Sequence, residues 1–398
     1  MHQKIIRSIA VFTAAILLVA FFAFFVFAKS EADLHRVIAD VTAQMAVDCP
    51  APTFSPIGGE WTVICLARSG YYPVNDRYFN DYYQRVVASV NTVAPTVAAA
   101  SGALHRAKST DNARLILALS AIGKDPRAVG NWDIVAPYED FSWVQKQGIN
   151  GVAYALLALD SADYETTDPS IRRQCVSYIL ERQLPDGGWA LTGDTADTDV
   201  TGMVLQALAN YRDDEAVVAA ADRGIACLAR MQDGGGFFAT RGVRTAESSA
   251  QAIVALCAWG VDANTDARFV KNGVSALSAL MRYYIGDAHA FCHTLDDEKD
   301  EMATDQACYA LIAYDRFFNG DNFLYDMSDV TGLPAEMGTT AILLPAQPMN
   351  APATIKDRTV SIPRTGDDFA DRAAVAAVLA VSSLCVVLAL FSRRRKDR

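Results

Sequence analysis

Residues 199–211, DVTGMVLQALANY, set the pattern on which the fold prediction rests. Apolar or small side chains occupy almost every position after the first turn, so a helix over this stretch would be apolar on all sides. A helix of that kind is buried on every face and packs closely against its neighbours. We therefore expect residues 199–211 to form an inner helix of a helical domain.

Five further segments share this pattern, and a second type of segment alternates with them. The inner type recurs at residues 59–70, 112–123, 150–161, 247–260 and 305–317. In residues 214–231, by contrast, Val217, Ala221 and Ile225 form one apolar stripe and Asp222 lies off it, as in a surface helix. Similar outer helices are predicted over residues 31–47, 76–95, 137–147, 169–183 and 265–284.

Alternating inner and outer helices indicate a repeat fold. An open array would leave one face of each inner helix in water, and these helices have no polar face. The sequence therefore predicts an all-α fold, an α/α toroid of six helical hairpins over about residues 30–328.

Two stretches resemble the QW-type repeat of the prenyltransferase and squalene-cyclase superfamily. They are YILERQLPDGGWA, residues 178–190, and LARMQDGGGFFA, residues 228–239. The set of motifs is similar to that of secreted bacterial surface proteins with this toroid, related in fold to the α domain of transcobalamin-type carriers. The resemblance implies a corrinoid as the one cofactor to consider, whereas the residues themselves predict none. We expect Trp189 and Phe237 to be structural staples, because glycines beside them allow sharp turns.

The N-terminal segment, residues 1–29, is typical of an export signal. Residues 8–28 carry no charge and follow Lys4 and Arg7. This order predicts a signal peptide cleaved near Ala28. The stretch is also long enough to span a bilayer uncleaved, as a signal anchor. Either way, the rest of the chain is expected outside the cytoplasm.

The C-terminal segment, residues 362–398, resembles the sorting signal of Gram-positive wall-anchored proteins. IPRTG precedes an uncharged stretch, residues 373–391, and a basic tail. In that family a sortase attacks the carbonyl of the threonine, here Thr365, which precedes Gly366; Ile362 stands where leucine is usual. A single-span membrane anchor is the alternative. Residues 329–361 contain prolines and are predicted to be a linker.

Charge and cysteine content limit the partners. The net charge is −11 and the termini alone carry basic clusters, so nucleic acid is not expected as a partner. Seven of the eight cysteines would face an oxidising compartment, where Cys49–Cys65 and Cys175–Cys227 are candidate disulfides. His289, Cys292 and His293 cluster without a fourth ligand, so no metal site is predicted.

A carboxylate or an amide stands at or beside the start of each inner helix. These residues are Glu60, Asp111, Asn150, Asp199, Glu247 and Asp305. Capping and first-turn placement explain each one alone. Parallel inner helices would gather all six at one mouth, near Trp61 and Tyr309, as in a ligand site.

The stretch DTDVTGM, residues 197–203, resembles the DxDD motif of class II terpene cyclases. Asp197 and Asp199 match the first two acids, and the second is the proton donor in that family. Val200 replaces the last acid, and the chain has room for only one of the two helical domains those enzymes need. The start of a helix is therefore the preferred interpretation, with Asp199 as a capping residue and no catalytic acid.

The residues favour a surface-anchored binding module that takes a small molecule, a glycan or a protein at the mouth. An enzyme related to terpene cyclases and prenyltransferases, or a glycan-active toroid, is the alternative. A glycosidase needs two carboxylates, about 5–5.5 Å or 6.5–9.5 Å apart. Glu60 with Asp199 or with Glu247 are the pairs to consider. An open centre of the ring would favour a ligand, and a filled centre a structural or interaction role.

Overall fold

The computed structural model describes residues 33–72, 76–97 and 101–331. The chain divides into two units, Met1–Met349 and Asn350–Arg398, and all described residues belong to the first. The predicted signal segment, the sorting signal and the C-terminal span lie outside the described residues. Within the described ranges, no helix combines the length and the apolar character that crossing a membrane requires.

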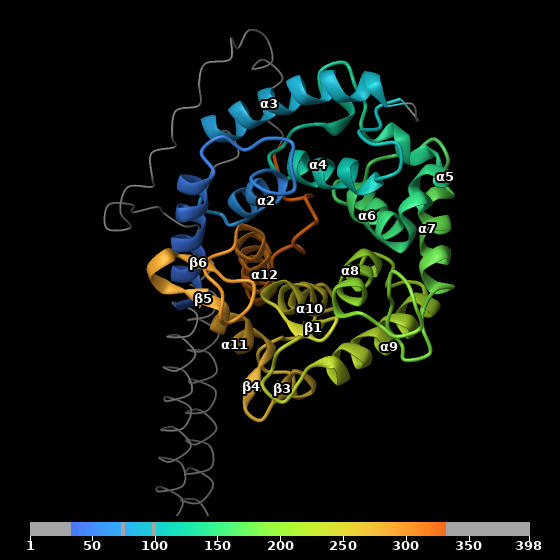
Figure 1. Ribbon diagram of the computed structural model, residues 1–398. Coiled ribbons are helices and arrows are strands. Elements are labelled where there is room, and N and C mark those ends of the chain that lie inside the picture. Colours follow the sequence, from blue (N-terminus) through green and yellow to red (C-terminus); the bar gives the residue numbers. More distant parts are fainter. Residues whose placement is uncertain (1–32, 73–75, 98–100, 332–398) are drawn as a thin grey trace, which may run out of the picture. The chain divides into compact units, whose positions relative to one another are not determined.

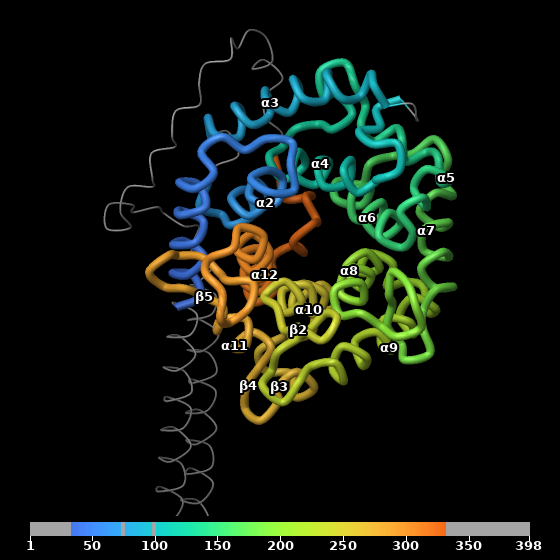
Figure 2. The backbone as a smooth tube through the Cα atoms, viewed as in Figure 1, coloured from blue at the N-terminus to red at the C-terminus, as the bar shows by residue number. Residues whose placement is uncertain are grey.

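Six helices form a closed inner ring. Each contacts the next along the chain, and the last contacts the first, as Figures 1 and 2 show. They are α2 (Glu60–Arg68), α4 (Ser109–Ala121), α6 (Gly148–Asp160), α8 (Thr198–Leu208), α10 (Ala246–Ala258) and α12 (Glu301–Asn319). Most of their side chains are buried, which confirms the prediction of inner helices from their apolar character.

The outer elements lie around this ring (Figure 1). The long ones are a helix over residues 33–48, α3 (Arg77–Val93), α7 (Ile171–Leu180) and α9 (Glu215–Met231). Two outer positions hold only the short helices α5 (Phe141–Val144) and α11 (Ala276–Leu280). The remaining 3-10 turns are η1 (Ala94–Thr96), η2 (Pro126–Ala128), η3 (Ala136–Glu139), η4 (Gln145–Gln147), η5 (Ala267–Phe269), η6 (Met281–Tyr283) and η7 (Gly286–Ala288).

The predicted outer helix over residues 265–284 is wrong for most of its length. Strands β3 (Val270–Lys271) and β4 (Val274–Ser275) form an antiparallel hairpin there. Asn272 and Gly273 connect the strands with positive φ angles of 50° and 82°. Asn-Gly suits this two-residue turn, because both central residues need a left-handed backbone. The predicted helix over residues 137–147 is likewise broken into α5 between η3 and η4.

Two further hairpins complete the described strands. β1 (Ala239–Thr240) pairs with β2 (Val243–Arg244), and β5 (Tyr284–Ile285) pairs with β6 (Ala290–Phe291), both antiparallel. Each hairpin lies in the segment that leads into α10 or α12. These segments therefore frame the same end of the ring.

The first QW-type stretch staples neighbouring hairpins, as predicted. Trp189 is buried and its Nε1 donates to the carbonyl of Ile179 at 2.9 Å. The amide of Gln183 donates to the carbonyls of Gly187 and Ala220, each at 2.7 Å. Gly187 has φ +90°, and a Cβ there would lie 2.7 Å from a backbone oxygen of the next outer helix. The motif thus satisfies carbonyls freed at a sharp turn.

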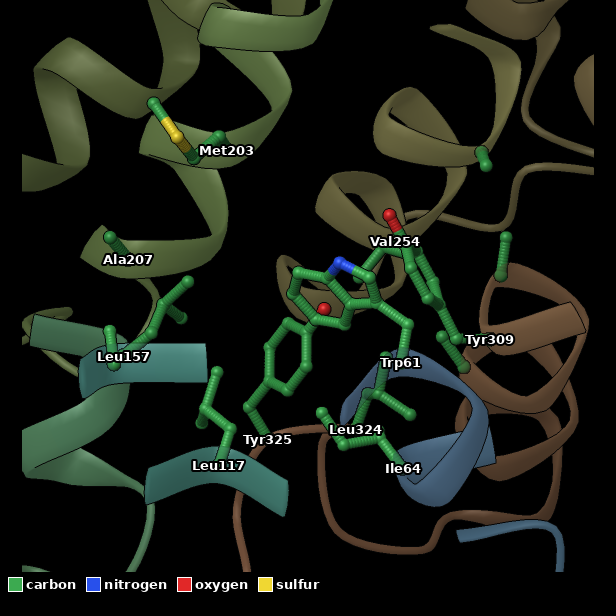
Figure 3. Close-up of a cluster of buried hydrophobic side chains, with 14 of the residues drawn as sticks. Trp61, Ile64, Leu117, Leu157, Met203, Ala207, Val254, Tyr309, Leu324 and Tyr325 are labelled. Atoms are coloured by element: carbon green, nitrogen blue, oxygen red, sulfur yellow. The ribbon is translucent and has the colours of Figure 1, made fainter. Parts of the chain in front are cut away.

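The segment after α12 fills the middle of the ring. Leu324 and Tyr325 are only 1% and 3% exposed. Figure 3 shows them beside Trp61 and Tyr309, among apolar side chains of the surrounding helices. The backbone N–H of Met327 donates to the carbonyl of Ser161, the C-cap of α6, at 2.7 Å.

Arg68, the last residue of α2, fixes this segment. Its Nε donates to the carbonyl of Leu324 at 3.1 Å, and Nη2 donates to that of Asp326 at 2.9 Å. Its Nη1 pairs with Asp329 at 2.7 Å, and Asp329 also binds Arg316 near the end of α12. The segment therefore enters the ring from the C-terminal ends of the inner helices, and we call the opposite end, where these helices begin, the mouth.

Candidate functional site

The mouth is formed by the N-terminal turns of the six inner helices. Contacts within the first two turns show that neighbouring helices start at the same end. Glu60 of α2 meets Arg114 of α4, and Thr62 of α2 meets Asp305 of α12. The structure therefore brings the six predicted mouth residues to one end of the ring.

Glu60 is a structural residue of this ring. Its side chain is 0% exposed, and Oε2 accepts from Arg114 Nε at 2.8 Å. Oε1 accepts from the backbone N–H of Ser55 at 3.1 Å. Burial raises the pKa of Glu60 to about 7, and the neighbouring Arg114 opposes this rise. In the closed ring Glu60 offers no surface to a ligand, whereas its predicted role in ligand binding and in the two carboxylate pairs stays a prediction.

Asp305 is also buried, with 1% of its surface exposed. It accepts from Thr62 Oγ1 at 3.0 Å, which ties α12 to α2. Burial raises the pKa of Asp305 well above its ordinary value. Like Glu60, Asp305 offers almost no surface to a ligand, and its predicted contact with one stays a prediction.

Asp197, rather than Asp199, caps α8. Asp197 Oδ1 accepts from the backbone N–H groups of Asp199 at 3.0 Å and Val200 at 3.1 Å. Its Oδ2 accepts from Thr240 Oγ1 of β1. A side-chain oxygen at the N-cap satisfies amides that the helix itself leaves free. The prediction that Asp199 is the capping residue is therefore wrong by two positions.

Asp199 lies in the first turn of α8 and is only partly buried. Its Oδ1 has no hydrogen-bond partner among the described residues. Burial raises the pKa of Asp199 to about 6, opposed by a hydrogen bond with Ser248. The charges of Asp197 and Glu247 raise the pKa further. At near-neutral pH this carboxyl can therefore hold or release a proton.

Glu247 stands beside Asp199 on the next inner helix, α10. Its side chain is 14% exposed, and both carboxylate oxygens lie near His293 Nδ1, at 2.9 and 3.0 Å. The hydrogen bond with Glu247 raises the pKa of His293 above its ordinary value. Asp199, Glu247 and His293 therefore form one interacting cluster, the α8–α10 cluster.

Asp111 and Asn150 lie at the starts of α4 and α6, and both are partly exposed. Asp111 pairs with Arg114 at 3.4 Å. Arg114 therefore connects the exposed Asp111 to the buried Glu60. The carboxylates in this part of the mouth are paired with Arg114, whereas Asp199 forms no ion pair among the described residues.

Aromatic and amide side chains form the floor of the mouth. Trp61 lies 5.7 Å from Tyr309 and 6.2 Å from Tyr154 between ring centroids, with tilted planes. Gln251 donates to the hydroxyl of Tyr309 at 2.6 Å and to Gln306 Oε1 at 3.1 Å. Tyr154, Gln251 and Gln306 keep partial exposure, so this floor presents polar groups around aromatic rings.

The floor residues Tyr154, Gln251 and Gln306 were absent from the sequence-based prediction. Tyr154 and Gln251 stand four residues after Asn150 and Glu247, and residues four apart share a helix face. Extending each mouth residue by one turn would have found Tyr154 and Gln251 but not Gln306, which directly follows Asp305. The predicted floor residues Trp61 and Tyr309 are 7% and 1% exposed, so they support the floor from beneath.

Exposed apolar side chains lie in the segments that precede four inner helices. We call them the rim residues, and they are Ile57 before α2, Leu191 before α8, Val243 before α10 and Leu295 before α12. They are four of the five exposed large apolar side chains among the described residues.

A search of family models and a search of curated proteins found no match. A solved structure does resemble the chain, the crystal structure of an unsaturated glucuronyl hydrolase from Bacillus sp. GL1 that is responsible for the degradation of glycosaminoglycan. The identity is 15%, over 74% of this chain and 100% of that chain, with a TM-score of 0.50. The fold is an α/α toroid. At this identity the likeness shows the fold alone, and it agrees with the predicted fold class.

Metal ligands do not gather in the toroid as far as the structure describes it. Residues 33–72, 76–97 and 101–331 contain no group of three or more His, Cys, Asp or Glu side chains able to hold a metal ion. In the predicted cluster, Cys292 donates to the carbonyl of Tyr283 at 3.2 Å, and His289 contacts the hydroxyl of Tyr284 at 3.3 Å. His293 pairs with Glu247, so the three side chains serve different partners.

A hollow of about 350 Å³ lies on the other face of the toroid. It is lined by residues at the C-terminal ends of α8 and α10, including Asn210 and Arg212, and by Phe323. It contains none of the predicted site residues. We therefore place the candidate site at the mouth.

Proposed function

We propose that this toroid is a glycan-active protein whose site is the mouth and whose proton donor is Asp199. The observation that carries the proposal is the state of Asp199. Its capping role belongs to Asp197, one of its oxygens has no partner, and its pKa is raised to about 6. Glycoside cleavage needs a carboxyl that remains protonated near neutral pH, beside a second carboxylate.

Glu247 is the second carboxylate of this proposal. It is close enough to Asp199 to raise the pKa of that residue, and His293 holds its carboxylate in place. Either carboxylate separation would support a reaction, with the shorter one favouring a covalent intermediate and the longer one an attack by water.

The floor of the mouth suits a sugar ring. Apolar faces of a sugar can pack on Tyr154, while Gln251 and Gln306 can exchange hydrogen bonds with its hydroxyl groups. The mouth carries several carboxylates and the whole chain has a net charge of −11. Neutral sugars and amino sugars are therefore favoured over polyanionic glycans.

Binding without cleavage is the second candidate, and one observation favours it. Tyr325 and Leu324 fill the middle of the ring beside Trp61, and a filled centre favours an interaction role. A protein of this kind can hold the end of a glycan at a cell surface. Terpene cyclisation is not proposed, because Val200 replaces the last acid of the DxDD motif.

The experiment compares the exported full-length chain with Asp199→Asn, using neutral, amino-sugar and uronate oligosaccharides. Calorimetry measures binding, and chromatography measures released sugars. Cleavage by the wild type and binding without cleavage by Asp199→Asn would support the proposal. Asp213→Asn, in a loop away from the mouth, is the matched control. Binding by both proteins without cleavage supports the second candidate, and no binding at all rejects both.

We include export and surface anchoring in this proposal because of the signal-like segment, residues 1–29, and the sorting-signal-like segment, residues 362–398. A glycan-active toroid held outside a Gram-positive cell would meet wall or host glycans. The test is fractionation of cells that express the wild type or Thr365→Ala. Equal extraction of both by detergent would reject sortase attachment, and a full-length cytoplasmic chain would reject export.

A further inference from the structure

The first and last inner helices, α2 and α12, close the ring through a polar contact at the mouth. Thr62 Oγ1 donates to Asp305 at 3.0 Å, across a separation of 243 residues in sequence. At the far end, Arg68 and Arg316 both bind Asp329, at 2.7 and 2.6 Å. The two helices therefore run in the same direction and in register along their contact.

Cys65 and Cys308 lie in the middle of this contact. Cys65 follows Thr62 by three residues, and Cys308 follows Asp305 by three, which is nearly one helical turn in each case. In parallel helices, two residues that face each other predict that the residues one turn further along each helix also face each other. The Thr62–Asp305 pair therefore predicts that Cys65 faces Cys308. Cys65 Sγ donates to the carbonyl of Asp305 at 3.3 Å, so this thiol faces α12 at the level that the register predicts.

The surroundings of the two thiols agree with this register. Both side chains are 0% exposed. Burial raises the pKa of Cys65 well above its ordinary value, and the thiol of Cys308 contributes to the rise. Among the seven cysteines that the structure describes as free thiols, Cys65 and Cys308 are the pair that interact with each other.

The candidate disulfides from the sequence are not supported by these neighbours. Cys49 lies beside Tyr78, while Cys65 faces the opposite partner in α12. Cys227 contacts Met231, at 3.8 Å between sulfur atoms. The charge of Asp160 acts on Cys175, and the neighbours that influence this thiol include no cysteine.

We propose that Cys65 and Cys308 form a disulfide that closes the ring covalently in the exported protein. One S–S bond forms, and the two thiols lose two protons and two electrons. The electrons pass to the disulfide of an oxidised thiol–disulfide oxidoreductase outside the cytoplasm, which becomes a dithiol.

The bond must form before the ring closes. In the folded toroid neither thiol has exposed surface, and the raised pKa of Cys65 keeps it protonated, whereas exchange requires a thiolate. Oxidation therefore takes place on the exported chain while α12 is still undocked. The bond then links nearly the whole domain, and long loops gain most from such a link.

The test maps thiols in the full-length protein secreted into an oxidising compartment. The chain is alkylated under denaturing, non-reducing conditions, digested, and examined by mass spectrometry. We expect a linked pair of peptides that contain residues 65 and 308, two hydrogens lighter than the reduced pair and lost on reduction. The double variant Cys175→Ser/Cys227→Ser should keep the linked pair.

A thermal measurement provides a second readout. Reductant should lower the Tm of the wild type by about 5–15 °C, and it should leave Cys308→Ala unchanged. If the chain is not exported, refolding in a glutathione redox buffer before the same mapping decides the question. Full alkylation of both thiols, or a link between Cys49 and Cys65, would overturn the proposal.

Discussion

The side chain of Asp197 accepts a hydrogen bond from the backbone N–H of Asp199 at 3.0 Å. The first acid of the DTDVTGM stretch therefore caps α8, and the second acid does not. One carboxyl satisfies the helix start, and the other remains in the mouth with an oxygen that no described residue bonds. Asp197 therefore has a structural role, and Asp199, two residues later, is available for chemistry.

Replacement of Asp199 by Asn should abolish glycan cleavage while leaving the fold intact. Loss of a proton donor lowers kcat by about 10²–10⁴-fold. In the wild type, kcat/KM should fall as the pH rises through about 6, because burial raises the pKa of Asp199 to that value. A pH–rate profile measures both effects, and an unchanged profile in Asp199→Asn would exclude this residue as the donor.

The same carboxyl should make the stability of the toroid depend on pH. Its pKa is raised in the folded state, so its contribution is fully present below about pH 4 and is lost as the pH rises through about 6. The loss is on the order of 3 kcal/mol. Urea unfolding at several pH values should show this decrease in the wild type and a flatter dependence in Asp199→Asn.

Glu60→Gln should destabilise the protein strongly. The substitution leaves the Arg114 guanidinium buried without its fully buried partner, which costs about 3–5 kcal/mol. Asp125→Asn, which breaks the exposed pair with Arg127, should cost less than about 1 kcal/mol. Chemical denaturation compares the two, and equal effects would show that the Glu60–Arg114 pair does not stabilise the ring.

Tyr325→Ala should destabilise the toroid by about 3–5 kcal/mol, because it leaves a cavity among Trp61 and Tyr309. Leu191→Ala, at an exposed rim position, should change stability by less than about 0.5 kcal/mol. A mild effect of Tyr325→Ala in thermal or urea unfolding would mean that the segment after α12 is not part of the folded core.

His293 should titrate above the usual range for histidine, because Glu247 stabilises its protonated form. Any stability that this pair contributes is present at low pH and is lost as the pH rises through the raised pKa. NMR titration should show a lower pKa for His293 in Glu247→Gln than in the wild type. Glu298→Gln, on the same loop, serves as the control.

The inner helices could be predicted because a helix that is buried on every face appears in the sequence as a run of apolar and small residues. The mouth could be predicted because each helix start carries a polar residue. The exposure of each mouth residue could not be predicted, since Glu60 and Glu247 both stand at the start of an inner helix. In the structure Glu60 is fully buried against Arg114, whereas Glu247 is 14% exposed and pairs with His293. Such partners are distant along the chain and meet only in the closed ring.

The outer elements were predicted less well for a different reason. A surface helix needs only one apolar face, and a hairpin with a few buried side chains can present a similar pattern. Asn272 and Gly273 were the local signal that distinguished them, because their turn requires left-handed backbone. The segment Asp321–Thr331 could not be placed from sequence, since nothing in its composition shows that the ring needs it at its centre.

The attachment of that segment has a mechanical consequence. Suppose that the chain beyond Thr331 tethers the toroid, as its sequence predicts. Tension would then reach the fold first at Asp329, where Arg68 and Arg316 hold it from the first and last inner helices. The load would fall on the contact between α2 and α12, which closes the ring. Both helices would share it, so α12 would not separate from the ring alone. Pulling experiments should therefore find one high-force rupture of the whole domain, preceded by no early release of the C-terminal hairpin.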